Sequence, residues 1–561
     1  MASMMVGGME VIESGNTGDI EFATFIERLK NLQRSAVVRL ATEESWSIWA
    51  TGSSESETED RFVTRVEMPT VAVLALAICD DGPSRMTPTR SEVIALGTDL
   101  LNVRSPISDD GAHQSELESL RSALLNSQYF KKVAPKPGDL RAVYAFLTAA
   151  REIRAQWAFR TTGPAGLARA WALAQGIEKA EPGFLAHFES EWGATLREVL
   201  LSVVALLNIA GSNNPTLPGA FSLNVPTPET TLCFGIPVAR LQKVASRLST
   251  SASFFPGWFE TASQTLHATS LKFLPQPLAI TPFVEIEASR EGPGLLPPAF
   301  VAPSPSHMMW RAQSIVLDVA RVLNQTNNRM NDAIGAAVAS YVGDFLRALC
   351  GPQNVVNLDE VFGSKDKSHA DFAVLVGTTA ILVESKTSIG GAMNKSVISP
   401  GGYVTTWSRI WHAYLQCVST SRAAKFKTHP VFSAVTDFIH IATFEEHLCV
   451  ESGALNAIAV HDGLFKEERF ACAEALTVQE FEDALVIYGP EGLADEISFK
   501  WQSRKFDQPL GTYLRTRPTP KRPFSDRSYS KEIHLNFFKS TGVLDAMRAT
   551  DQSICASRAK K

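Results

Sequence analysis

Cysteine is scarce in this sequence and never occurs in close pairs. The 561 residues include seven cysteines, all scattered singly, with no Cys-X-X-Cys spacing. A zinc ribbon or a disulfide framework needs paired cysteines, so neither is indicated, and isolated thiols suit a reducing cytoplasm. The chain also lacks a Gly-X-Ser-X-Gly nucleophile elbow and a Gly-X4-Gly-Lys-Ser/Thr phosphate loop. Nothing therefore points to a serine hydrolase of that kind or to a nucleotide-hydrolysing motor.

Long apolar segments are missing as well. The longest apolar runs are Val71 to Cys79 and Leu200 to Leu207, whereas a membrane-spanning helix needs about 20 apolar residues. Residues 1–18 are acidic and have neither the basic nor the apolar region of a signal peptide. We therefore expect a cytoplasmic protein that is neither secreted nor membrane-spanning.

The net charge is small, but the charges are unevenly distributed. The formal net charge is −6 and the pI is near 6.1, which does not by itself indicate a nucleic-acid-binding protein. Residues 1–60 carry a net charge of −7. Residues 501–561 contain thirteen Lys or Arg and five Asp or Glu, a net charge of +8. The acidic N-terminal end therefore favours basic partners, and the basic C-terminal end favours acidic ones such as nucleic acid.

Length favours a chain of several domains, and the helices and strands that the sequence predicts make it a mixed α/β (α+β) chain. With 561 residues and 45% hydrophobic residues, the chain has enough apolar side chains for three or four domains. The expected divisions are an α-rich regulatory or sensing region over residues 1–220, a proline-rich accessory segment over 221–310, an α/β domain over 311–490 and a basic aromatic tail over 491–561.

Apolar periodicity predicts the main elements of the first 330 residues. Arg61 to Cys79 alternates and then becomes wholly apolar, which predicts a strand entering a core. Apolar residues at helical spacing predict helices over Leu140 to Phe159, Phe184 to Ala210, Ile236 to Ser251 and His307 to Asn324.

One hairpin stands out because it places charged side chains beside two apolar runs. Phe372 to Val376 and Ala380 to Val383 are rich in β-branched residues and are separated by Gly377-Thr378-Thr379. This pattern predicts two strands joined by a tight turn, in which Gly377 supplies a positive φ. If Val376 faces Thr379, the numbers of paired residues sum to 755.

This register has a chemical consequence. It sets Asp371 opposite Glu384 and His369 opposite Lys386. Because side chains alternate along a strand, Asp371, Glu384 and Lys386 are expected on one face, with opposed Cβ atoms roughly 5 Å apart. Facing carboxylates repel unless a cation lies between them, so a divalent ion or Lys386 is expected to neutralise them.

These residues resemble the D-(X)n-E-X-K signature of the PD-(D/E)XK, or restriction-endonuclease-like, nuclease superfamily. Glu384-Ser-Lys386 is the single Asp/Glu-X-Lys triplet in the chain. The resemblance implies an αβββαβ core in the C-terminal half, within residues 311–490. The elements that match its order are a helix over Asn331 to Leu349, a strand over Val355 to Val361, the hairpin, a helix over Val404 to Phe426 and a strand over Phe438 to Thr443.

The resemblance also implies roles for individual residues. Asp371, Glu384 and the carbonyl of Ser385 would bind Mg²⁺ or Mn²⁺, and Lys386 would orient or deprotonate the attacking water. His369 would contact phosphate or simply cap its strand. Gln416 matches a glutamine that some subfamilies carry on the following helix.

The sequence departs from the family pattern in two places. Family members often carry a glutamate in the first helix, where this chain has Ala339, and Asp332, Asp344 or Glu360 is left to replace it. Glu360 ranks first because it lies near the end of the strand before the hairpin. Ala370 stands where the family often has proline.

The tail has the composition of a nucleic-acid-binding surface. Between Phe499 and Lys531, basic residues alternate with aromatic ones, and such surfaces use cations for phosphates and aromatic rings for bases. An edge that pairs with the acidic N-terminal region is an equal alternative. The basic residues of interest are Lys500, Arg504, Lys505, Arg515, Arg517, Lys521 and Arg522.

Two functions from different classes follow. The first is a metal-dependent nuclease that acts on DNA in preference to RNA, in defence against foreign DNA by analogy with other chains that carry such domains. The second is an inactive protein on the same fold, in which Lys386 forms a buried ion-pair cluster and the chain binds nucleic acid or another protein. Under either function, the N-terminal region is available to contact a second copy or a partner protein.

Overall fold

The computed structural model describes most of the helices and strands of the chain. It covers residues 4–6, 9–11, 20–51, 67–101, 164–212, 219–223, 236–265, 277–286, 299–324, 329–363, 368–387, 400–423, 429–445, 472–503 and 510–518, with residues 122, 125, 126, 505 and 524. The helix predicted over Leu140 to Phe159 and most of the basic tail lie outside these residues.

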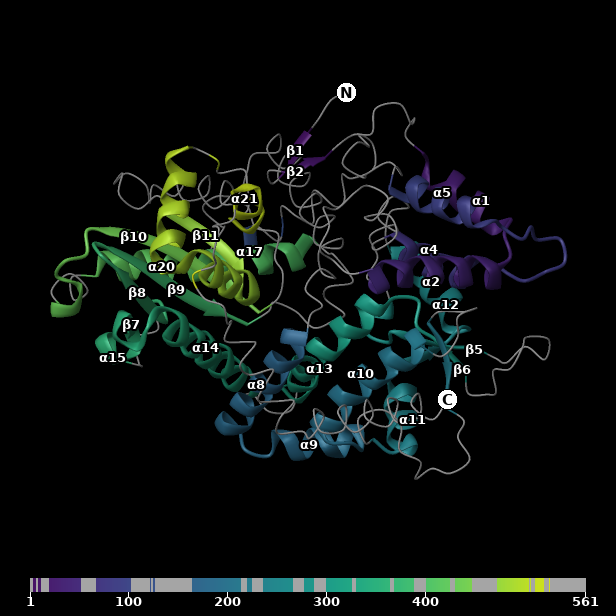
Figure 1. The fold of residues 1–561 in the computed structure, drawn as a ribbon, viewed down its shortest axis with the longest axis horizontal. Coiled ribbons are helices and arrows are strands. Elements are labelled where there is room, and N and C mark those ends of the chain that lie inside the picture. Colours follow the sequence, from purple (N-terminus) through teal and green to yellow (C-terminus); the bar gives the residue numbers. More distant parts are fainter. Residues whose placement is uncertain are drawn as a thin grey trace, which may run out of the picture.

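Five helices form a bundle built mainly from the first hundred residues (Figure 1). Its central helix, α4, has ten of its eleven residues buried, so the strand predicted at the end of Arg61 to Cys79 is wrong. A helix that is apolar on every side shows no 3.6-residue period, and its sequence resembles that of a buried strand. The helices are α1 (Phe22–Lys30), α2 (Arg34–Thr51), α4 (Met68–Ile78), α5 (Arg90–Leu101) and α12 (Phe254–Thr265).

A second group of helices connects this bundle to the C-terminal half. The described part of residues 1–220 is α-rich, as expected, and the helix predicted over residues 307–324 is present. The helix predicted over residues 184–210 is divided into α9 and α10 at Gly193. The helix predicted over residues 236–251 ends at Arg247, where a strand follows. The group consists of α8 (Pro164–Ala180), α9 (Phe184–Trp192), α10 (Leu196–Ser212), α11 (Val238–Arg247) and α13 (Pro305–Asn324).

A small four-stranded sheet lies in the accessory segment, where the sequence predicted one helix and otherwise extended, proline-rich chain. Its strands have three or four residues each, which is too short to show a two-residue period. Its order is β3-β6-β5-β4, with β3 at Ala220–Ser222, β4 at Ser249–Ser251, β5 at Phe283–Ile286 and β6 at Ala299–Val301, and the 3₁₀ turn η5 at Pro277–Ala279. A separate pair, β1 (Met4–Val6) and β2 (Met9–Val11), is antiparallel.

A five-stranded mixed sheet forms the C-terminal half, with strand order β11-β10-β9-β8-β7. Strands β7, β8 and β9 pair antiparallel, whereas β9, β10 and β11 run parallel. The predicted order of helix, three strands, helix and strand is present. The elements are α14 (Arg329–Cys350), η6 (Pro352–Asn354), β7 (Val355–Asn357), α15 (Leu358–Phe362), β8 (Phe372–Val376), β9 (Thr379–Lys386), α17 (Pro400–Arg422), η7 (Pro430–Phe432), β10 (Asp437–Phe444), β11 (Cys472–Thr477), α20 (Val478–Gln502) and α21 (Leu510–Thr516).

The sheet differs from the prediction at two points. The strand predicted over residues 355–361 ends at Asn357, whose side chain accepts a hydrogen bond from the Asp359 amide and caps α15. Strand β11 and the long helix α20 were not predicted. The capping box of Thr477 and Glu480 that starts α20 is a sequence signature that would have indicated this helix.

The hairpin has the predicted register. Five pairs run from Phe372↔Val383 to Val376↔Thr379, so each pair of residue numbers sums to 755 as expected. Gly377 has a φ of 57° at the turn, a conformation that costs glycine little.

The two faces of the sheet are covered by different helices. Leu382 and Ala380 of β9 pack with Cys417 of α17, while Val383 belongs to the other core, on the side of α14 and α20. Phe345 of α14 and Phe481 of α20 meet edge to face, with ring centroids 5.6 Å apart. Residues of β9 therefore alternate between α17 and the α14–α20 layer.

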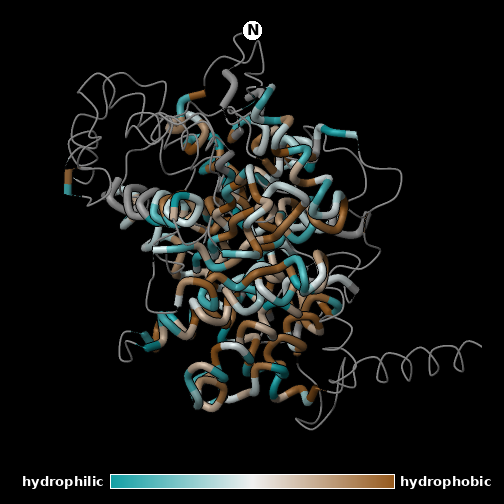
Figure 2. Tube along the Cα trace, turned by 90° about the vertical axis from the view of Figure 1, so that its left-hand side faces the viewer, coloured by the Kyte–Doolittle hydropathy of each residue, from teal (hydrophilic) through white to brown (hydrophobic). Residues whose placement is uncertain are grey.

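One core crosses the expected divisions of the chain. It runs from Trp46 to Tyr513, and Figure 2 shows apolar segments gathered in the interior. The divisions expected at residues 310 and 490 fall inside α13 and α20, the second at a kink where Gly489 has a φ of 69° before Pro490.

Among the described helices, α14 has the length and composition to cross a membrane. The bent pair α9–α10 would be a second span if counted as one. Here α14 packs against α8, β9 and α20.

Candidate functional site

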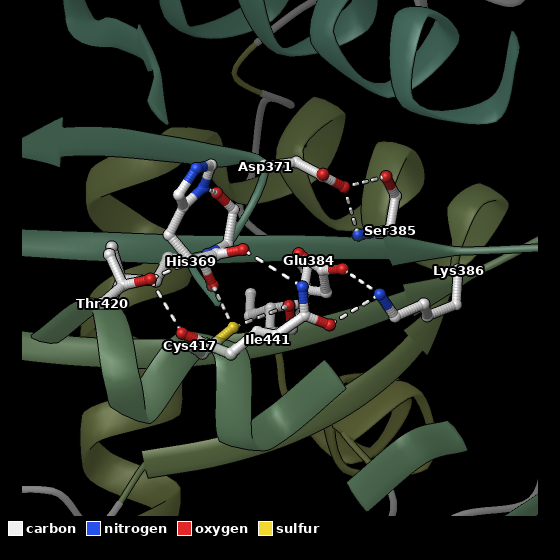
Figure 3. A network of polar contacts seen from close by, with 11 residues as sticks. His369, Asp371, Glu384, Ser385, Lys386, Cys417, Thr420 and Ile441 are labelled. Atoms are coloured by element: carbon white, nitrogen blue, oxygen red, sulfur yellow. Dashed lines mark hydrogen bonds and ion pairs between the residues drawn. The ribbon is translucent and has the colours of Figure 1, made fainter. Parts of the chain in front are cut away.

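Glu384 and Lys386 lie at the carboxyl end of β9, on the face that α17 covers. The Lys386 ammonium donates to Glu384 Oε1 and to Gln416 Oε1, the latter at 2.7 Å (Figure 3). Gln416 in turn donates from Nε2 to the carbonyl oxygen of His369 at 3.2 Å. The structure therefore brings together four of the predicted residues, with Gln416 linking Lys386 to the segment that precedes β8.

Glu384 is an incompletely paired buried carboxylate. The residue is 2% exposed, and within the described part of the chain its Oε2 atom has no hydrogen-bond partner. Burial, followed by the charge of Asp371, raises the pKa of Glu384 to about 8. Glu384 therefore carries a proton much of the time at neutral pH, and a cation would favour its ionised form.

Asp371 was predicted to lie on the same face as Glu384, and this prediction is wrong. The ladder ends at Phe372, and Asp371 Oδ2 accepts hydrogen bonds from the Ser385 amide at 2.8 Å and from the Ser385 hydroxyl (Figure 3). The Ser385 side chain projects to the opposite face of β9 from Glu384 because neighbouring residues alternate. Asp371 lies beyond the regular strand, so the alternation rule does not fix its side chain. Burial raises its pKa, and the Ser385 hydrogen bonds oppose the rise.

His369 and Ala370 attach the entry of β8 to its neighbours. The Ala370 amide donates to Thr420 Oγ1 of α17 at 2.7 Å. The His369 ring is buried, stacks on Phe362 at a centroid distance of 5.3 Å and has Nε2 3.5 Å from Asp359 Oδ1. These contacts support the strand-capping alternative for His369 rather than a phosphate contact.

The acidic residue closest to the site from α15 is Asp359 rather than Glu360. The charge of Asp359 contributes to the raised pKa of Asp371, behind burial and other causes. Glu360 is exposed and accepts a hydrogen bond from Asn357 at 3.3 Å. Asp332 and Asp344 are exposed on α14. The ranking of Glu360 rested on a strand continuing to residue 361, and the start of α15 at Leu358 turns that side chain away.

The donor atoms near the end of β9 are of the chemical kind that binds a hard divalent cation, but the two carboxylates lie on opposite faces of the strand. Two carboxylates are present, one with an unused buried oxygen, and the N–H of Ser385 points toward Asp371. The N–H and C=O of one strand residue project to the same side, so the Ser385 carbonyl points the same way. Oxygen ligands of this kind are those that Mg²⁺ prefers. In the described part of the chain, no group of three or more His, Cys, Asp or Glu residues could hold a metal ion.

The basic tail contributes less surface than the sequence suggested. Lys500 is fully buried and its ammonium lies 2.6 Å from Glu474 Oε1, so it is excluded from a nucleic-acid surface. Arg517 pairs with Glu496 at 2.9 Å and lies over the Phe499 ring. Lys505 is exposed over the Tyr513 ring. Arg515 lies on α21, and Arg504, Lys521 and Arg522 lie outside the described residues.

Comparison with known proteins gives no relative. No family model, no curated protein and no solved structure matches this chain.

Proposed function

We propose that this protein is a Mg²⁺- or Mn²⁺-dependent phosphodiesterase of the PD-(D/E)XK type that cleaves nucleic acid, with DNA favoured over RNA. The observation that carries the proposal is the pair at the end of β9, a buried carboxylate with one unused oxygen beside an ammonium group. The element order of the five-stranded sheet supports it further. The location of the protein in the cytoplasm, a role in defence and contacts through the N-terminal region extend the proposal by analogy.

Each residue of the site has a part in this mechanism. Glu384 and the Ser385 carbonyl would hold the metal ion, and Asp371 would join them by turning its carboxylate from Ser385 toward Glu384. A bound ion would supply Lewis-acid chemistry for the phosphoryl oxygen and for the attacking water. The Lys386 ammonium has three donors, and Glu384 and Gln416 accept two of them. The third donor is directed elsewhere and stabilises negative charge on the phosphate or orients the attacking water. Gln416 acts as a positioning residue because it holds the lysine.

A non-catalytic nucleic-acid-binding or interaction protein on this fold is the second candidate. The contact between Lys386 and Glu384 favours it, since an ammonium group that neutralises the carboxylate replaces the metal ion. In that protein, removal of Lys386 would leave a buried carboxylate uncompensated, at a cost on the order of 3 kcal/mol or more.

The deciding experiment compares wild type with Lys386→Ala and Asp371→Ala on DNA and RNA, with Mg²⁺, with Mn²⁺ and with chelator. Lys386→Ala should abolish cleavage and retain Mn²⁺ binding, whereas Asp371→Ala should lose both because it removes a ligand. Lys179→Ala, an exposed position on α8, is the control and should cleave like wild type. The nuclease proposal is refuted if wild type cleaves nothing with either metal and Lys386→Ala has a far lower melting temperature. That result supports the non-catalytic binding protein.

A further inference from the structure

Helix α17 continues beyond the end of β9, and its direction follows from the strands that it connects. It links the parallel strands β9 and β10 and therefore runs back from the carboxyl end of β9, where Gln416 Oε1 accepts from Lys386. Lower residue numbers on α17 therefore lie past the carboxyl edge of the sheet. At 1.5 Å per residue, His412 lies ~6 Å and Arg409 ~10 Å beyond the level of Gln416. The spacing of 409, 412 and 416 keeps these residues on one side of the helix.

This stretch of α17 lies near the positive charges of Lys386 and Arg321. Desolvation, followed by the charge of Lys386, lowers the pKa of His412, so His412 is close to Lys386 and is a neutral donor at pH 7. Desolvation and then the charge of Arg321 lower the pKa of Arg409, so an arginine of α13 lies near it.

The carboxylate of Asp318 is shared between two arginines of α13. Asp318 accepts from Arg311 through Oδ2 and from Arg321 through Oδ1, the latter at 3.3 Å. One carboxylate thus serves two arginines. Within the described part of the chain, Arg409 forms no ion pair, and its side chain is exposed. A cation left without a carboxylate next to like charges favours binding of an anion.

We propose that His412 and Arg409, with Arg321 beside them, bind the phosphates of the nucleic-acid strand that leaves the Glu384–Lys386 site along α17. This assignment rests on the proposed function for the nature of the ligand. A duplex presents one phosphate per strand for every ~3.4 Å of its axis, so a ~10 Å stretch of helix spans roughly three phosphates. The contacts involve the backbone alone, so the surface adds affinity and register without base preference.

The test measures binding rather than cleavage, using a fluorescent DNA duplex in chelator at several salt concentrations. Arg409→Gln should reduce the slope of log K against log salt by ~0.9. When salt is lowered from 1 M to 0.1 M, the affinity of the variant should therefore rise about eight-fold less than that of wild type. Arg422→Gln is the matched control, because Arg422 is exposed in the last turn of the same helix, on the far side of Gln416. It should keep the wild-type slope. His412→Ala removes a neutral donor and should weaken binding without changing the slope.

The outcomes separate this surface from the catalytic proposal. A slope that is unchanged in Arg409→Gln, or equally reduced in Arg422→Gln, overturns the surface, as does wild type that fails to bind the duplex. Unaltered affinity in His412→Ala removes His412 from it. A protein that cleaves no substrate but shows the Arg409-specific slope refutes the nuclease and supports the surface.

Discussion

Replacement of Glu384 by glutamine should make stability less sensitive to pH. The folded pKa of Glu384 is about 8, against an ordinary value of 4.5. Below pH 4.5 both states are protonated and the group has no effect. Between pH 4.5 and 8 the unfolded chain releases its proton while the folded chain keeps it, so the free energy of unfolding falls as pH rises. Above pH 8 the full penalty is present.

The magnitude follows from the two pKa values. Each pH unit between them is worth ~1.4 kcal/mol, so ionised Glu384 lowers the free energy of unfolding by on the order of 5 kcal/mol. Glutamine has no such penalty. The stability of Glu384→Gln relative to wild type should therefore increase by a few kcal/mol between pH 5 and pH 8.5.

Urea unfolding in chelator at half-unit steps over this range measures the difference. Glu360→Gln is the control, since Glu360 is exposed on α15, and its difference from wild type should stay flat. If the advantage of Glu384→Gln is flat, or if the variant becomes less stable as pH rises, the reasoning is refuted. Glu384 would then be held as a charged partner of Lys386, in the manner of a structural ion pair.

Three further predictions concern the metal, the tail and the packing of the sheet. Mn²⁺ affinity, measured by calorimetry, should rise with pH up to about 8 with proton release, because the ion binds ionised Glu384; constant affinity over pH 6–8 would contradict this. Lys500→Ala should lower the free energy of unfolding by about 3–5 kcal/mol because it leaves Glu474 buried and unbalanced, whereas Lys505→Ala, at an exposed position, should change it little. Gly343→Ala places a Cβ 2.7 Å from the Phe372 ring and should destabilise by about 1–3 kcal/mol. Gly335→Ala on the same helix meets open space and should be neutral or stabilising, so equal melting temperatures for the two variants would refute the packing argument.

Local sequence determined the hairpin and its register. A turn at Gly377 with φ of 57° and two short apolar runs leave few ways to pair, so the positions of Glu384 and Lys386 at the end of β9 followed from the sequence. Helix α14 and strand β10 were also predicted from their patterns, within two residues at each end. These features depend on neighbours close in the chain.

The tertiary structure decided what those residues contact. Asp371 accepts a hydrogen bond from Ser385 because the β8–β9 ladder ends at Phe372, which leaves the Asp371 side chain outside the regular strand. The buried ion pair of Lys500 and Glu474 forms because α20 packs against β11. For α4, burial on every side removed the period that distinguishes a helix from a strand. The sequence does not show whether a lysine or an apolar run is buried or exposed. Packing against segments distant in the chain determines its burial, its ion-pair partners and its pKa.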